Sequence, residues 1–406
     1  MIKLAFGKWS YNRYFRYSMY IFLVYCFIPA IRSLPLVTFQ IPLVLLSYFF
    51  LLLSILNRGD RHHAANFLIF TVLLAIFNYV FIYLQDYDVG SQVLTTAIGV
   101  NFSFFVSTFP LLIVYSGELK YVEDRDALLR FVFLLVIFTS ITTIIGTFQY
   151  EAPCRQLAGN NNPALNQLYT QRNIGGYRFI YFLVLACPLM MRRILNRVNF
   201  ENCLVLVLSV ICIMRSEYTT ALLMVIAIIL ICVFIKNNNA TGIFLVCLVF
   251  GVFLFYYERV LMWLISQFSH SYSIVSRLEM LLTYNNTGNV TGDLFIRQEL
   301  YNKSWNSFVS NPLIGSLLRS GQFVGGHSEI LDYLGHSGIL GLLVFGVLLK
   351  SIKQRLAICG FLFDKYNIVL LVVALAIAFL NTFSAPELFI AVTVLQVLFS
   401  KTNKQD

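Results

Sequence analysis

The sequence has few charged residues, which make up 12% of its 406 residues, whereas hydrophobic residues make up 59%. A soluble domain carries about 25% charged residues, and apolar runs of about 20 residues mark membrane spans. A large soluble helical protein would need polar faces at helical spacing, which most of these segments lack. The composition therefore argues against a soluble protein and predicts an all-α, polytopic membrane protein.

The sequence also lacks the patterns of a cysteine-based site. Seven of the eight cysteines lie in apolar runs, and Cys154 is the one in a polar loop. No pair has metal-ligand spacing, and one loop cysteine cannot build a disulfide framework. We therefore expect the cysteines to serve as packing residues.

Apolar windows bounded by charged or turn residues predict about twelve transmembrane helices. The N-terminus is basic and runs into the first window without a small-residue cleavage site, so we expect a membrane anchor and not a cleaved signal peptide. The sixth, seventh and tenth windows are shorter than the roughly 20 residues of a typical span. The twelve windows are 17–31, 39–56, 65–84, 92–116, 129–149, 179–191, 203–214, 219–235, 241–257, 337–349, 366–384 and 388–400.

The positions of Lys and Arg in the short loops predict the orientation, because cytoplasmic loops are enriched in both. With both termini in the cytoplasm, 19 of the 29 basic residues lie inside and 10 outside. Nine of the ten outer residues are arginines, whereas the inner set has ten arginines and nine lysines. Arginine binds phosphate bidentately. The outer excess therefore favours an anion site on the periplasmic side, with pairing to outer carboxylates as the alternative for part of the set.

The expected organisation has three parts. Residues 1–257 hold helices one to nine with a periplasmic loop at 150–178, residues 258–336 form a large periplasmic region, and residues 337–406 hold helices ten to twelve and a cytoplasmic tail. The large region begins with an amphipathic stretch that we expect to lie in the membrane interface. A helix from about Asp293 to Ser310 then ends at Asn311-Pro312, because proline cannot continue it.

Residues 325–341 carry the pattern that points to chemistry. Gly325-Gly326 predicts a flexible turn, with a helix starting near His327, so the histidine would lie beside free backbone N–H groups that favour anions. Glu329, Asp332 and His336 follow at steps of three and four and share one face of that helix. We expect the helix to run on into the tenth span through small residues, which permit close helix contact.

The order of these residues resembles the signature of the O-antigen ligase and Wzy-type polysaccharide polymerase superfamily. His327-Ser328 is followed by nine residues, Gly338, two residues and Gly341. Upstream lie Ser276-Arg277-Leu278, Arg297 and the run from Asn311 to Gly315. The resemblance covers residues 276–345 and is architectural elsewhere.

The resemblance implies a GT-C-like glycosyltransferase that works without a metal, nucleotide sugar or other cofactor. Its donor would be an oligosaccharide linked through pyrophosphate to undecaprenol, and its acceptor would be a second such lipid. The enzyme would also contact membrane lipids. A chain-length regulator protein is a candidate partner, and no nucleic acid is expected. A polymerase is favoured over a ligase that transfers the glycan to lipid A-core, because the 150–178 loop combines arginines with many amides. A transporter is the third alternative, although the expected spans hold almost no ionisable residues.

The resemblance also implies roles for individual residues. Arg277 and Arg297 match the positions that hold the pyrophosphate, and His327 matches the histidine near the acceptor. A histidine suits the role of base or acceptor orienter, and the alternatives for His327 are a phosphate contact or a structural role at the helix start. Arg178, Arg172 and Arg215 are further pyrophosphate candidates with looser matches, since the order Arg215-Ser216 reverses the usual Ser-Arg pair.

Other candidates are less specific. Glu329 and Asp332 are expected to orient His327 or bind sugar hydroxyls, with a solvated helix face as the alternative. Tyr333, together with Tyr284 and Trp305, is a candidate for stacking on sugar rings. His336 is expected to be structural, and no metal site is predicted. The spacing Asp86-Tyr87-Asp88 resembles a metal motif, but it is common in turns.

Overall fold

The computed structural model describes residues 10–83, 94–122, 125–159, 162–236, 256–269, 272–287, 292–317, 324–359, 361 and 364–400. Across these residues the chain is helical and contains no strand, which confirms the all-α prediction. The expected span at 241–257, except for its last two residues, and the Asp86-Tyr87-Asp88 turn lie outside the described residues.

The helices follow one another along the chain with short connections. The first part contains α1 (Ser10–Phe27), α2 (Pro29–Arg32), η1 (Leu36–Gln40), α3 (Ile41–Asn57), α4 (Arg61–Tyr83), α5 (Leu94–Tyr115), η2 (Glu118–Tyr121) and α6 (Arg125–Gln149). The middle part contains α7 (Pro153–Gly159), α8 (Pro163–Gln171), α9 (Tyr177–Asn196), α10 (Phe200–Arg215) and α11 (Thr219–Ile235). The last part contains α13 (Tyr257–Gln267), α14 (Tyr272–Thr287), α15 (Gly292–Ser310), α16 (Glu329–Ile358), α17 (Lys365–Leu380), α18 (Pro386–Ile390), η3 (Ala391–Leu395) and α19 (Gln396–Phe399).

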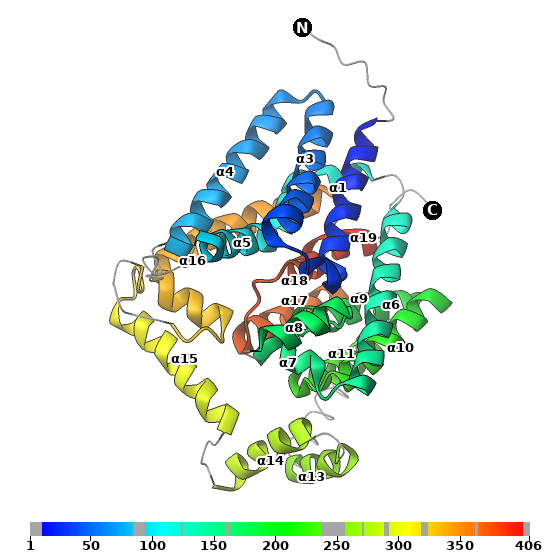
Figure 1. Ribbon diagram of the computed structural model, residues 1–406, viewed down its shortest axis with the longest axis vertical. Helices are drawn as coiled ribbons and strands as arrows, with labels where there is room; N and C mark the ends of the chain where they lie inside the picture. The colour runs from blue at the N-terminus through cyan, green and yellow to red at the C-terminus, as the bar shows by residue number, and fades with distance from the viewer. Residues whose placement is uncertain are drawn as a thin grey trace.

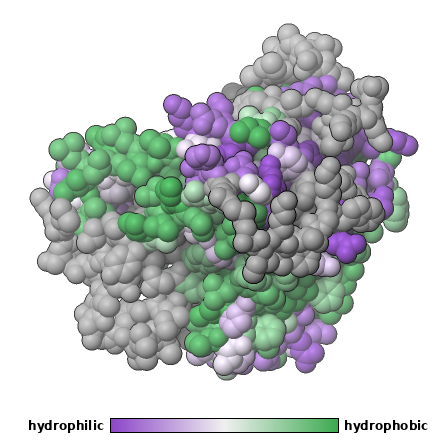
Figure 2. Space-filling view, turned by 90° about the horizontal axis from the view of Figure 1, so that it is seen from above, coloured by the Kyte–Doolittle hydropathy of each residue, from purple (hydrophilic) through white to green (hydrophobic). Residues whose placement is uncertain are grey.

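Four helical segments among the described residues are long and apolar enough to cross a membrane: Leu36–Asn57, Arg125–Gln149, Tyr177–Asn196 and Glu329–Ile358. Shorter apolar helices include Thr219–Ile235 and Lys365–Leu380. Large apolar side chains are exposed along these helices, among them Phe148. Figure 2, turned to look onto the upper end of Figure 1, shows broad hydrophobic areas beside a hydrophilic region. These are the features of a helical membrane protein.

Helix α9 is the central helix of the fold. Its residues from Phe179 to Met191 are buried without interruption, as expected for a helix that is apolar on all sides. It packs against α10, α11, α17 and α18 (Figure 1). The first turn of α9, with Tyr177 and Arg178, therefore lies at one end of the centre of the fold.

Polar contacts between loops fall into two groups. Arg58 pairs with Glu118 at 2.9 Å, which joins two loops expected in the cytoplasm. Arg32 pairs with Glu387 at 2.8 Å, which joins two loops expected outside. No ion pair within the described ranges connects one group to the other. Each of these two ion pairs thus joins loops that were expected on the same side of the membrane.

The junction between α15 and α16 corrects one expectation and agrees with another. Helix α15 ends at Ser310, before Asn311-Pro312, as predicted. The next helix does not run on smoothly into the tenth span, because Gly338 breaks it with φ 58° and ψ −156°. The two N–H groups that follow Gly338 donate to the carbonyl oxygens of Pro312 and Leu313, at 2.8 and 3.0 Å. Gly338 thus permits close contact, as expected for a small residue. The contact is with the turn at Pro312 and Leu313, however, and α16 is unwound where it forms.

Candidate functional site

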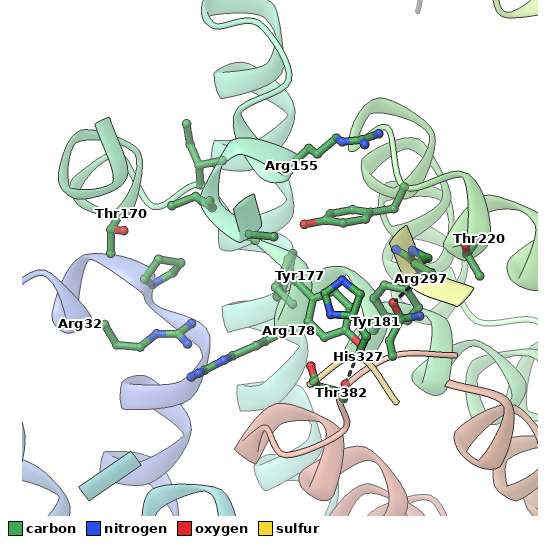
Figure 3. Close-up of a pocket in the computed structure, with 18 of the residues that line it drawn as sticks. Arg32, Arg155, Thr170, Tyr177, Arg178, Tyr181, Thr220, Arg297, His327 and Thr382 are labelled. Carbon is green, nitrogen blue, oxygen red and sulfur yellow. Dashed lines mark hydrogen bonds between the residues drawn. The ribbon is translucent and has the colours of Figure 1, made fainter. Parts of the chain in front are cut away.

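A cavity of about 670 Å³ lies among α2, α7, α8 and α14, the starts of α9, α11 and α15, and the end of α17 (Figure 3). Within the described part of the chain, no aspartate or glutamate lines it. Clustered guanidinium groups without lining carboxylates make a positive site in which phosphate oxygens can be bound bidentately. The five arginines that line it are Arg32, Arg155, Arg178, Arg277 and Arg297.

The cavity brings together residues from both long outer segments expected from the sequence. Arg178 comes from the 150–178 segment, whereas Arg277, Arg297 and His327 come from the 258–336 segment. In Figure 3, the ends of Arg32 and Arg178 point toward one another at the left of the view. Arg297 and His327 lie to the right of this pair. Four of the predicted site residues therefore meet in one place.

Arg32 is fixed at the cavity by a buried carboxylate. Its guanidinium pairs with Glu387 at 2.8 Å, and the Glu387 side chain is fully buried. Arg32 also donates to the carbonyl of Cys26 at 3.0 Å. Burial lowers the pKa of Arg32, but the groups around it, with Glu387 the largest of them, together outweigh that effect and the net pKa is raised. Arg32 thus remains charged, and Glu387 balances that charge from behind the cavity wall.

Arg297 attaches α15 to the end of α17. Its Nη1 donates to the Asn381 Oδ1 and to the carbonyl of Leu380, at 3.4 and 3.5 Å. Tyr301, one turn later in α15, donates to the same Leu380 carbonyl at 2.8 Å. Both acceptors of Arg297 are neutral, so these contacts orient the guanidinium without cancelling its charge.

His327 is exposed, lines the cavity and lies two residues before α16. The helix begins slightly later than expected because Ser328 acts as its N-cap, accepting from the Leu331 N–H at 3.2 Å. The His327 Nδ1 lies 3.1 Å from the carbonyl of Gly326. A carbonyl only accepts, so we assign the proton of the neutral ring to Nδ1. The Nε2 atom is then left free to take up a proton.

Asp332 holds the backbone on both sides of His327. Its Oδ1 accepts from the Gly326 N–H at 3.1 Å and from the Ser304 hydroxyl at 2.5 Å. Its Oδ2 accepts from the Ser328 N–H at 3.0 Å. This carboxylate is therefore not part of a solvated helix face, and it fixes the residues that flank His327.

Glu329 also bonds to protein groups. Its carboxylate accepts from the Phe383 N–H at 3.0 Å and from the Ser384 hydroxyl. Both partners follow the Asn381 and Thr382 residues that line the cavity. Glu329 thus connects the start of α16 to a wall of the cavity but does not line it.

Three further predicted residues lie away from the cavity. Arg172 ends α8 and is exposed. Arg215 donates to the carbonyl of Thr147 at 3.2 Å and lies over the ring of Phe148 at 4.3 Å. Tyr333 donates to the carbonyl of Gly341 at 3.2 Å, within its own helix. The structure does not bring these side chains to the arginine cluster.

The remaining candidates lie elsewhere as well. Tyr284 and Trp305 are about half exposed, at 50% and 49%, and neither lines the cavity. His336 is buried and lies 3.2 Å from the Ser316 hydroxyl through its Nδ1, which fits the structural role expected for it. Cys154 is buried beside the cavity wall and is a free thiol.

Several cavity residues were not identified as site residues from the sequence. Arg32 and Arg155 belong to the arginine-rich outer set, so the charge bias was a signal that could have found them. Tyr177, Tyr181 and Tyr218 also line the cavity. Nothing in the sequence distinguishes these three among its 23 tyrosines.

The chain matches no protein-family model, and no curated protein matches it at a significant level. Among the described residues, no group of three or more His, Cys, Asp and Glu side chains is placed to hold a metal ion. The cavity offers fixed positive charge, one histidine with an available nitrogen, aromatic rings and neutral hydroxyl and amide groups. This set can bind a phosphorylated ligand and accept a proton from a hydroxyl beside it.

Proposed function

We propose that this chain is a glycosyltransferase of the bacterial inner membrane. It polymerises undecaprenyl-pyrophosphate-linked oligosaccharide repeat units into O-antigen or a related surface polysaccharide. One observation carries the proposal: Arg178, Arg277, Arg297 and His327 line a single cavity, although they come from two separate segments of the chain. These are residues at which a pyrophosphate and an acceptor hydroxyl would be expected to meet.

In the proposed arrangement, about twelve helices cross the membrane in a GT-C-like fold, both termini are cytoplasmic, and the cavity faces the periplasm. The excess of basic residues in the loops assigned to the cytoplasm supports this orientation. The four apolar helices of sufficient length and the grouping of loop contacts support the alternating path. A chain-length regulator protein remains a candidate partner.

The arginines serve the donor in this proposal. A lipid pyrophosphate carries negative charge that grows at the bridging oxygen as the glycosidic bond breaks. Guanidinium groups already fixed by protein contacts stabilise that charge without rearranging during the reaction. Arg297 meets this requirement through its neutral acceptors at the end of α17, and Arg32 meets it through Glu387.

His327 serves the acceptor. The acceptor hydroxyl oxygen attacks the anomeric carbon, a new C–O bond forms, and the bond from that carbon to the pyrophosphate oxygen breaks. The lipid pyrophosphate leaves with the bonding electron pair, and the hydroxyl proton passes to the Nε2 of His327. Asp332 fixes the backbone around the histidine through Gly326 and Ser328, so the ring is held before substrate arrives.

The test is deletion of the gene in its native host, followed by gel analysis of the surface glycan. A polymerase is indicated by loss of the ladder with one repeat unit kept on the core. Complete loss of glycan from the core, with lipid-linked glycan accumulating, would instead indicate a ligase. An unchanged ladder would refute both.

Two variants from the same loop make the test specific to the cavity. Arg178 lines the cavity, whereas Arg172, six residues earlier, ends α8 and does not line it. Complementation with Arg178→Ala should fail to restore the ladder, and Arg172→Ala should restore it. Equal behaviour of the two variants would contradict the assignment of the site.

A further inference from the structure

Three tyrosines form an aromatic wall in the arginine-lined cavity. Tyr177 and Tyr181 lie one turn apart in α9, with ring centroids 4.6 Å apart. Tyr218, which precedes α11, lies 6.1 Å from Tyr177 and 6.0 Å from Tyr181 by the same measure. All three line the cavity. The separations are those of interacting aromatic rings, so the three side chains form one continuous surface.

Two of the three hydroxyl groups of this wall are bonded to the backbone. Tyr177 donates to the carbonyl of Thr382 at 2.7 Å, and Tyr218 donates to the carbonyl of Cys154 at 2.9 Å. Burial raises the pKa of Tyr218 far above its ordinary value, so its hydroxyl stays protonated and remains a donor. These bonds fix the rings of Tyr177 and Tyr218 and leave ring carbons as the part of these two side chains that can meet a ligand.

Neutral polar groups surround the wall. Thr220 and Asn381 line the cavity near Tyr181, as does Thr382 near Tyr177 (Figure 3). The Asn381 Oδ1 accepts from Arg297 at 3.4 Å. Its Nδ2 is buried and makes no hydrogen bond of ordinary geometry with the described residues, although the Tyr181 hydroxyl is nearby. The amide thus sits between an arginine and the aromatic wall, with its oxygen toward Arg297 and its nitrogen beside the Tyr181 hydroxyl.

We propose that Tyr177, Tyr181, Tyr218 and Asn381 form a saccharide subsite that holds the sugar ring attached directly to the donor pyrophosphate. The inference rests on the proposed function and deepens it. A pyranose presents C–H groups that pack against aromatic rings and hydroxyls that need neutral partners, and this wall offers both beside the arginines.

The experiment compares two lipid probes on the purified full-length protein. One is undecaprenyl pyrophosphate, and the other is the same lipid pyrophosphate carrying a single N-acetylhexosamine. We expect wild type to bind the sugar-bearing probe more tightly. Tyr177→Leu should weaken binding of that probe by about 3- to 10-fold, the range for loss of one aromatic contact. Binding of the sugar-free probe should not change.

Two control variants separate the subsite from general structure. Tyr177→Phe keeps the ring and loses only the bond to Thr382, so it should retain the preference for sugar. Tyr169→Leu removes a buried tyrosine that lies 5.3 Å from the ring of Tyr150 and does not line the cavity. It should leave both affinities unchanged. Tyr218→Leu repeats the test from another element if Tyr177→Leu does not fold.

The outcomes distinguish the two levels of the proposal. Failure of wild type to bind the sugar-free lipid would overturn the proposed function and the subsite with it. Tight binding of that lipid with no gain from the sugar would overturn the subsite alone. Equal weakening of both probes by Tyr177→Leu would assign the wall to the lipid chain or to the shape of the cavity, and no weakening of either would remove it from binding.

Discussion

Asp332→Asn tests whether the loop around His327 is held in place for chemistry. The wild-type carboxylate accepts three hydrogen bonds, and its Oδ2 accepts the Ser328 N–H at 3.0 Å. An asparagine keeps one acceptor oxygen and places an NH₂ group where a second acceptor is needed. Loss of a hydrogen bond to a charged group costs about 1.5–3 kcal/mol. We expect the thermal unfolding temperature to fall and the turn from Gly326 to Ser328 to loosen.

The functional effect should be separable from this loss of stability. Because the arginines are untouched, the variant should bind the lipid donor normally, while its rate of chain extension falls by at least about tenfold through misplacement of the base. The matched control is Asp364→Asn, which removes the charge of an aspartate at the start of another helix, where it is the N-cap of α17. Asp364 accepts from the Asn367 N–H at 2.9 Å and pairs with Arg192, far from the cavity residues.

Extension of a lipid-linked repeat, donor binding and thermal unfolding are measured on both variants. Asp364→Asn should unfold at a lower temperature and still extend the chain at nearly the wild-type rate. Wild-type extension by Asp332→Asn would refute the positioning role of this carboxylate. Loss of donor binding by Asp332→Asn would place it in the anion site instead.

The other predictions concern the charges of the cavity and the orientation of the chain. Arg297→Lys should express normally but lose most activity in the extension assay, because a point charge cannot replace the bidentate fork; full activity would reassign Arg297 to a structural contact. His327→Ala should slow extension by about 10²- to 10⁴-fold while donor binding persists, and near-normal extension would end the proposal of a base. Glu387→Gln should leave the partly buried Arg32 charge without its carboxylate and lower the unfolding temperature; an unchanged unfolding temperature would show that the pair is not needed for stability. In spheroplasts, an impermeant thiol reagent should label Gln171→Cys and not Asn196→Cys, and the reverse pattern would contradict the orientation.

The end of α15 was predictable from the sequence, whereas the break in α16 was not. Proline at 312 removes a backbone donor and cannot extend a helix, so the boundary depends on local chemistry alone. Gly338 is compatible with both a continuous helix and a break. The break is fixed by the carbonyl oxygens of Pro312 and Leu313, which accept the freed N–H groups. These partners are more than twenty residues away, and no local pattern indicates them.

The arginines show the same limit within one loop. Arg172 and Arg178 are equivalent by composition and by predicted sidedness. Arg178 lies in the first turn of the central helix and lines the cavity, while Arg172 ends a short helix and is exposed. The difference depends on where α9 begins and on how that end packs. The gathering of outer-loop arginines with His327 was therefore predictable from charge and residue order, but which arginines line the cavity was not.

The partners of the arginines explain more than their number does. In the loops expected in the cytoplasm, Arg58 and Arg192 pair with Glu118 and Asp364. Arg125 donates to the carbonyl of Cys359 at 3.0 Å. Those guanidinium groups join loops, so the arginines expected on the cytoplasmic side also serve structure.

In the cavity, Glu387 balances Arg32 from behind the wall, and Arg297 rests on neutral oxygens. Arg178 makes no ion pair with any described residue. Like charges gathered in this way repel one another unless an anion enters between them. The same residue type thus completes the fold at one end of the molecule and, at the other, leaves positive charge that a pyrophosphate would neutralise.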